Sequence, residues 1–141
     1  LHDALPISIE KTSMVKTYKM PLLLAFYNGG NIKLKIDEES IFQSFREFYS
    51  KPSNAVDLLR HDSTKNYKNF NKKDYLRVAE NPIKAFLNSA KDFFYRDKSY
   101  FCLNGDLGEF IKNHEFIENV KDIIDYRTRR FYKERLEKLE K

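Results

Sequence analysis

The feature that most constrains the fold is a run of large apolar side chains at helical spacing after Asp37. Asp37 is a candidate N-cap, and the acidic residues Glu38 and Glu39 that follow it suit the first turn of a helix. One face of that helix would carry Ile41, Phe42, Phe45, Phe48 and Tyr49. With 12 Phe, nine Tyr, no Trp and only four Gly in 141 residues, we expect one globular unit whose core is built on aromatic rings.

The first half of the chain is predicted to hold one more helix and one short strand. Residues 17–27 place apolar side chains at helical spacing and stop at the turn-forming residues 28–30. Residues 31–36 alternate polar and apolar side chains, which is the period of a half-buried strand. The polar stretch 51–71 is predicted to be a loop with a short turn at residues 56–59.

The second half is predicted to be helical on both sides of a hairpin. Asp74 is a candidate cap for a short helix that ends at Glu80. Asn81-Pro82 is a typical start of a further helix, because Pro is tolerated at the first helical position. Residues 93–103 then predict two aromatic strands joined by a polar turn.

This order of helix, strand, helix, helix and hairpin is that of winged-helix domains, in which the first strand joins the hairpin as a third. We therefore predict an α+β, mostly helical fold with a winged-helix-like domain at residues 8–104. A C-terminal helical extension at residues 105–141 would hold a short helix and a long one. In such domains the helix before the hairpin is the one presented to DNA, and here it spans residues 81–91.

Residues 1–7, Leu-His-Asp-Ala-Leu-Pro-Ile, show no helical period, cap or signal-peptide character. The string looks like the in-frame translation of the end of a common short-read sequencing adapter. We predict that it is a sequencing scar, that natural sequence begins near Ser8, and that more of a longer protein lies upstream. A natural linker is the alternative.

Basic residues are the candidate binding groups. The 26 Lys and Arg residues exceed the 21 Asp and Glu residues by the net charge of +5, which permits polyanion binding but also fits an ordinary solubilising surface. The rings of Tyr67, Phe70 and Tyr75 could stack on bases, or could pin a solvated loop to the core. The predicted nucleic-acid-binding residues are Lys65, Lys68, Lys72, Lys73, Arg77, Lys84, Asn88, Lys91, Arg96 and Lys98, with the last two cations at the hairpin tip.

Motifs for catalysis are missing from the sequence. It has no phosphate-binding Gly-x-x-x-x-Gly-Lys-Ser/Thr loop, and His61 and His114 have no partner at metal-ligand spacing. Cys102 is the only cysteine, so the chain cannot form an internal disulfide or a cysteine zinc site, which favours a reducing, cytoplasmic location. The longest apolar run, residues 20–27, is far shorter than the ~20 residues that span a bilayer. We expect no catalytic site, metal or cofactor in this chain, and no membrane partner.

The stretch IEKTSMVKTYKMPLLLAFYNGG at residues 9–30 resembles the C-terminal region of bacterial DEAD/DEAH-box helicase family proteins, which are similar to type III restriction helicase subunits. The resemblance continues through IFQSFREFYS (41–50), NPIKAF (81–86), YFCL (100–103) and YRTRRFYKER (126–135). It implies a parent protein that uses ATP and Mg to move along or open nucleic acid through two helicase lobes upstream. The ATP- and Mg-binding residues of that family have no counterpart positions in this sequence.

Together these observations favour an accessory module that binds nucleic acid, with DNA preferred, close to a helicase motor. Its second partner would be the upstream helicase lobes of the same chain. The alternative is a protein-interaction or structural domain that packs on those lobes and does not touch DNA. An enzymatic function would require a cluster of reactive side chains that the sequence does not provide.

Overall fold

The computed structural model describes residues 4–28 and 30–140, and it is α+β and mostly helical, as the sequence predicts. In chain order the elements are α1 (Ala4–Lys11), α2 (Lys19–Leu24), β1 (Tyr27–Asn28), β2 (Asn31–Ile32), β3 (Lys35–Ile36), α3 (Glu38–Ser50), α4 (Pro52–Leu59), the 3-10 helix η1 (Tyr67–Asn69), α5 (Lys72–Ser89), β4 (Phe94–Asp97), β5 (Tyr100–Leu103), the 3-10 helix η2 (Gly105–Leu107) and α6 (His114–Glu140). Within the described ranges, no helix combines the length and the apolar character needed to cross a membrane.

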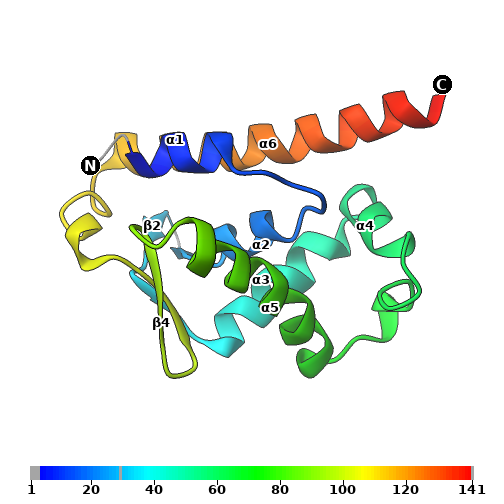
Figure 1. Ribbon diagram of the computed structural model, residues 1–141, viewed down its shortest axis with the longest axis horizontal. Coiled ribbons are helices and arrows are strands. Elements are labelled where there is room, and N and C mark those ends of the chain that lie inside the picture. The colour runs from blue at the N-terminus through cyan, green and yellow to red at the C-terminus, as the bar shows by residue number, and fades with distance from the viewer. Residues whose placement is uncertain (1–3, 29, 141) are drawn as a thin grey trace.

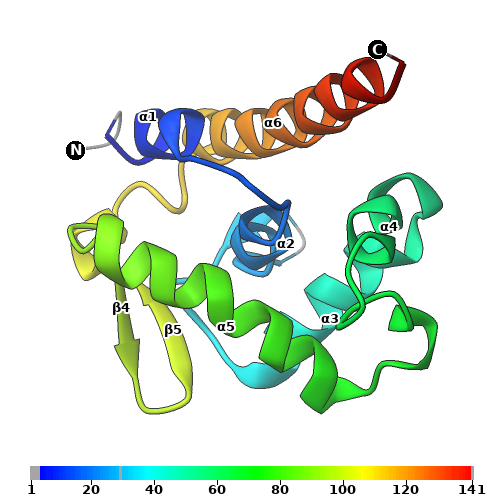
Figure 2. The same cartoon turned by 45° about the vertical axis from the view of Figure 1, so that its right-hand side comes forward.

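The short helix α2 lies at the centre of the molecule. It contacts α3 and α5 on one side and α6 on the other, and α1 lies alongside the first part of α6 (Figures 1 and 2). Met20, Leu22 and Leu23 of α2 are therefore buried. The sequence predicted a longer helix over residues 17–27, but Thr17 and Tyr18 form a turn, and the chain after Ala25 turns into β1.

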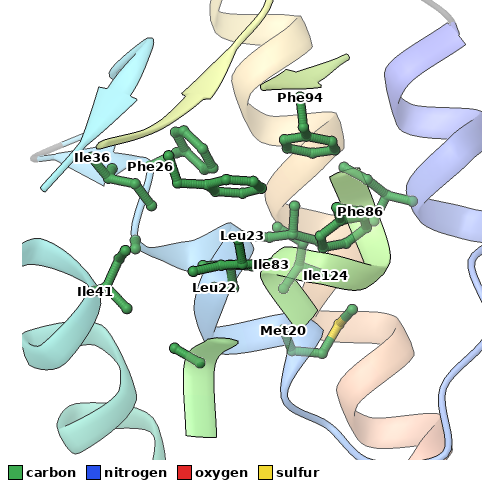
Figure 3. Packing of buried hydrophobic residues seen from close by; sticks show 14 of the residues in the cluster. Met20, Leu22, Leu23, Phe26, Ile36, Ile41, Ile83, Phe86, Phe94 and Ile124 are labelled. Carbon is green, nitrogen blue, oxygen red and sulfur yellow. The ribbon is translucent and has the colours of Figure 1, made fainter. Parts of the chain in front are cut away.

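A three-stranded antiparallel sheet packs on this centre, with the strand order β3-β5-β4. Its inner face stacks Phe94 on Phe101 with a centroid separation of 5.2 Å. The ring centroid of Phe94 also lies 4.7 Å from that of Phe86 of α5 (Figure 3). A strand from the first half thus joins the hairpin as predicted. The predicted single strand 31–36 is wrong in one respect: β2 pairs with β1, and only β3 pairs with β5.

Helix α3 confirms the clearest sequence prediction. Asp37 caps it, and one carboxylate oxygen of Asp37 accepts a hydrogen bond from the Ser40 backbone N–H at 2.8 Å. The predicted face is buried at Ile41, Phe45, Phe48 and Tyr49, with Phe42 half-buried. The helix ends where Pro52 follows, but Pro52 starts a further helix, α4, in the stretch predicted as loop.

Helix α5 corrects the prediction of two helices in this part of the chain. The structure has one continuous helix capped by Asn71, whose side chain accepts from the Asp74 N–H while the Asp74 carboxylate accepts from the Asn71 N–H, both at 3.0 Å. Asp74 is therefore the third residue of a capping box rather than the cap. Pro82 lies inside the helix and is buried, so tertiary packing outweighs the helix-breaking tendency of proline here.

The two ends of the chain pack on each other. Residues 4–7, in which the sequence showed no period, form the first half of α1, and Leu5 and Ile9 of α1 are buried. The predicted long C-terminal helix is observed as α6, and its Val120 and Ile124 belong to the same apolar cluster as Leu5 and Ile9. The short helix expected at 107–111 is replaced by η2 and turns. One core thus spans the division predicted between residues 104 and 105.

Candidate functional site

The outer face of α5 carries a line of exposed polar side chains. Lys73, Arg77, Lys84 and Asn88 are spaced by four, seven and four residues, which places them on one face of a helix. All four are exposed, and the opposite face of α5 is buried through Val78, Ala79, Ile83 and Phe86. Because the apolar face is fixed against the core, this polar face must point to solvent. The structure therefore brings these four predicted residues together on one face.

Two further predicted cations follow α5 in the chain. Lys91 stands in the turn between α5 and β4, so the predicted presenting helix ends two residues earlier, at Ser89. Lys98 lies at the hairpin turn with a positive φ of 55°. Within residues 4–28 and 30–140, the ammonium groups of Lys73, Lys84, Lys91 and Lys98 form no ion pair. These four lysines are available to an external anion, and we call them the α5-hairpin lysines.

The sequence predicts Arg96 as a free cation at the hairpin tip, but Arg96 lies in β4 and is paired. Its guanidinium donates two hydrogen bonds of 2.8 Å to the two carboxylate oxygens of Glu80 on α5. This pairing lowers the pKa of Glu80 and raises the pKa of Arg96. Arg96 therefore fastens the hairpin to the middle of α5, and its charge is already compensated by Glu80.

Three more predicted cations also have acidic neighbours. The ion pairs are Lys72 with Glu39 at 3.0 Å, Arg77 with Asp74 at 3.3 Å and Lys65 with Asp62 at 3.1 Å. The hydrogen bond from Lys72 lowers the pKa of Glu39. Such exposed pairs contribute little to stability, so a phosphate can compete for the cation. They nevertheless reduce the net positive charge of this surface.

The aromatic rings between residues 67 and 75 are not exposed platforms. Tyr75 is buried, and its ring meets Phe70 edge to face at 5.3 Å and lies 6.0 Å from Phe42 of α3. Tyr67 is half-buried on the same cluster. These rings pin the segment before α5 to the core, which is the alternative that the sequence left open. Lys65 and Lys68 remain exposed on that segment.

A buried polar centre around Asp57 was missed by the sequence analysis. The Asp57 side chain is fully buried, and its Oδ2 accepts from the backbone N–H of Thr17 at 2.8 Å and from the Thr17 hydroxyl at 3.0 Å. The Thr17 hydroxyl also lies 2.9 Å from the hydroxyls of Tyr49 and Tyr132. Asp57 of α4, Thr17 before α2, Tyr49 of α3 and Tyr132 of α6 therefore form one hydrogen-bonded cluster through the Thr17 hydroxyl.

Two cations complete this Asp57 centre at its rim. The Nζ atom of Lys16 lies 3.8 Å and an Nη atom of Arg135 lies 3.4 Å from Oδ1 of Asp57, an oxygen without a hydrogen-bond partner among the described residues. Burial raises the pKa values of Tyr49 and Tyr132, and the nearby Asp57 charge adds to both shifts. Burial also lowers the pKa of Lys16, although Asp57 opposes that shift.

The Asp57 centre has the character of a structural junction. Its carboxylate is contacted by Lys16 and Thr17 from the segment before α2 and by Arg135 of α6, and Tyr49 of α3 joins through the Thr17 hydroxyl. A sequence signal for it existed in the spacing of Asn54, Asp57 and Leu58, which share one face of a helix. The sequence predicts a loop at residues 51–71, where an aspartate is ordinarily solvated, so this spacing alone did not predict a buried carboxylate.

A groove of about 770 Å³ lies between α3, the start of α4 and α6. Leu24, Ala25 and Phe48 supply apolar parts of its wall, and Lys51 and Arg129 are among the charged residues that line it. Because both basic and acidic side chains line the groove, its net charge is neither strongly positive nor strongly negative. It was not anticipated from the sequence, because its walls come from elements distant in the chain.

No group of three or more His, Cys, Asp or Glu side chains in the described part of the chain is arranged to hold a metal ion. Cys102 is buried in β5. Comparisons with protein-family profiles, curated proteins and solved structures found no match to this chain. Lys73, Arg77, Lys84 and Asn88 share one exposed face of α5, and Lys91 and Lys98 lie in the two turns that follow it in the chain; these predicted residues are the candidate interface.

Proposed function

We propose that this chain is an accessory module that binds nucleic acid through the outer face of α5 and the hairpin after it. The α5-hairpin lysines carry the proposal, because these four exposed ammonium groups, which have no acidic partner among the described residues, follow one another along a helix and into a β-turn. Lysines placed in this way bind phosphates by charge, whatever the base sequence.

The order of elements supports a winged-helix-like mode of binding. Helix α5 precedes the hairpin β4-β5, and β3 adds to the hairpin as a third strand. In that arrangement α5 would lie against the major groove of DNA, and Lys98 at the turn would reach the phosphate backbone beside it. The ion pair between Arg96 and Glu80 would hold the hairpin at a fixed angle to α5.

The resemblance to the C-terminal region of DEAD/DEAH-box helicases supports a position for this module beside a helicase motor. We propose that it acts beside an ATP-dependent motor in the parent protein, holding duplex or single strand while the upstream lobes use ATP and Mg. In this chain the binding surface itself needs neither, since phosphate recognition rests on lysine side chains.

Fluorescence anisotropy with a labelled DNA duplex at several salt concentrations tests the proposal. Binding carried by phosphate contacts weakens steeply with salt, and the combined change Lys84→Gln, Lys91→Gln and Lys98→Gln should reduce the slope of log K against log salt by about three. The matched control replaces three exposed lysines outside this face, Lys112, Lys133 and Lys138, by Gln. Absence of binding at low salt, or equal losses in both triple variants, would show that α5 and the hairpin are not the interface.

A second candidate function is packing on the helicase lobes without contact to DNA. The observation that favours it is the exposed apolar pair Val56 and Leu59, three residues apart on α4, with exposed fractions of 39% and 54%. Changing both to Ser should weaken association with the separately expressed upstream lobes. Unchanged association in that variant would remove the support for this candidate.

A further inference from the structure

We propose that the outer face of the sheet β3-β5-β4 stacks unpaired bases of single-stranded nucleic acid on Tyr95 and Tyr100. This inference rests on the proposed function and names the form of nucleic acid that this part of the interface takes. Neither tyrosine was among the residues predicted from the sequence. Both are exposed, with exposed fractions of 46% and 38%.

The strand register places the two tyrosines on the same face. Tyr95 of β4 stands opposite Cys102 of β5, and Tyr100 precedes Cys102 by two residues, so all three side chains point to one side of the sheet. The alternate residues Phe94 and Phe101 point to the other side and form the buried core contact. Tyr95 and Tyr100 are therefore diagonal neighbours, about 7–8 Å apart at their Cα atoms.

Lysines flank these rings. Lys35 of β3 is paired with Cys102, which brings its side chain to the same face, and its Nζ lies 5.0 Å from the centre of the Tyr100 ring. That contact orients the ring while leaving it exposed. Lys98 lies at the hairpin turn, two residues before Tyr100. The acid on this face is Asp97, 3.9 Å from Lys35, and both side chains are about half exposed.

Unpaired nucleic acid is the occupant that fits this chemistry. Surfaces that bind single strands combine rings for the bases with cations for the phosphates, and the ring contact tolerates any base. Paired bases within a duplex do not offer their faces to a side chain. The hairpin is also fastened to α5 through Arg96 and Glu80, so this face and Lys98 at the turn keep a fixed position relative to the lysines of α5.

The test compares oligomers that carry the same phosphates but differ in their bases. Binding of the whole chain to a short oligothymidylate, to an abasic oligomer of equal length and to oligouridylate is measured at low salt. Stacking predicts that the oligomers with bases bind about tenfold or more tighter than the abasic one. Oligodeoxyuridylate, which differs from oligouridylate in the sugar alone, is measured in parallel, and a preference between these two identifies DNA or RNA as the source of the bases.

Three variants assign that preference to the rings. Tyr95→Ala with Tyr100→Ala should remove the advantage of oligothymidylate over the abasic oligomer without weakening abasic binding. Tyr95→Phe with Tyr100→Phe should keep the advantage, because the ring and not the hydroxyl makes the contact. Tyr126→Ala, at an exposed tyrosine of α6, is the matched control and should leave binding unchanged.

The outcomes separate this inference from the function on which it rests. Equal affinity of the wild type for the abasic oligomer and the oligothymidylate would overturn base stacking and leave phosphate binding by α5 standing. An undiminished advantage in the double Ala variant would overturn the assignment to Tyr95 and Tyr100. Failure of every oligomer and of duplex to bind would overturn both proposals.

Discussion

Replacing Asp57 by Ala tests whether the buried polar centre holds the two ends of the molecule together. The change removes the acceptor of two hydrogen bonds from Thr17, at 2.8 and 3.0 Å. It also removes the anion that faces Lys16 and Arg135. We expect a large loss of stability, because the partners stay in place while their common carboxylate is lost.

The size of the loss follows from the burial of these partners. Removing one member of a buried ion pair costs about 3–5 kcal/mol. Lys16 and Arg135 keep exposed fractions of 19% and 20%, so water can partly solvate both cations in the variant, which favours the lower end of that range. The Thr17 hydroxyl also keeps the hydroxyls of Tyr49 and Tyr132 as neighbours. The expected decrease in the free energy of unfolding is therefore about 3 kcal/mol.

Urea titration followed by helical circular dichroism measures this change. With a slope near 1.5 kcal/mol per molar urea, a loss of about 3 kcal/mol lowers the unfolding midpoint by about 2 M. Asp62→Ala is the matched control, because Asp62 carries the same group on a side chain with an exposed fraction of 98% beside Lys65. Its midpoint should stay close to that of the wild type.

Hydrogen exchange adds a local measurement to the same variant. Arg135 and Tyr132 belong to the second half of α6, so Asp57→Ala should speed amide exchange there more than in α3. A shift of the urea midpoint by less than about 0.5 M, or exchange in α6 equal to that of the wild type, would refute the view that Asp57 is a structural junction.

The remaining predictions concern the Glu80 pair and the first helix. Because Arg96 lowers the pKa of Glu80 below its ordinary value of 4.5, this group stabilises the fold above that pH and the contribution is lost as pH falls through the lowered pKa. Urea midpoints at pH 6 and pH 3 should therefore differ less in Glu80→Gln than in the wild type, and an equal or larger difference would contradict the assignment. Ile9→Ala, at a side chain only 1% exposed, should cost about 2–5 kcal/mol. Removing residues 1–7 should cost about 2 kcal/mol through the buried Leu5, and unchanged unfolding midpoints would show that α1 does not stabilise the core.

Local sequence signals predicted α3 well and α5 only in part, for a physical reason. The signals of α3 agree with one another, since Asp37 caps the helix and every large apolar residue falls on the face that the core covers. In α5 the dipeptide Asn81-Pro82 has the local signature of a helix start, yet Pro82 is buried within a continuous helix. Whether the helix continues through Pro82 depends on packing against α2 and α3, and a local sequence pattern does not contain that information.

The candidate site divides in the same way between local and distant causes. Exposure of Lys73, Lys84 and Asn88 follows from their position opposite the apolar face of α5, and the sequence period shows that position. The pairing of Arg96 with Glu80 across 16 residues of chain depends on how the hairpin folds back on α5. The Asp57 centre joins residues up to 115 positions apart, so a local pattern could at most have placed Asp57 on the buried face of a helix and could not have shown its partners.

The basic residues of α6 show why composition alone does not identify an interface. Arg127 donates to the backbone carbonyls of Ile9, Glu10 and Thr12, at and just beyond the end of α1, and Arg135 donates to the carbonyl of Val15. Arg127 thus satisfies carbonyls in the last turn of α1 that would otherwise lack donors, and Arg135 holds the segment that follows. The arginines of the C-terminal tail that make these contacts hold the N-terminal segment in place, whereas the α5-hairpin lysines have no such internal task. Cations that the described part of the fold leaves without internal acceptors are the ones open to phosphate, and the α5-hairpin lysines are among them.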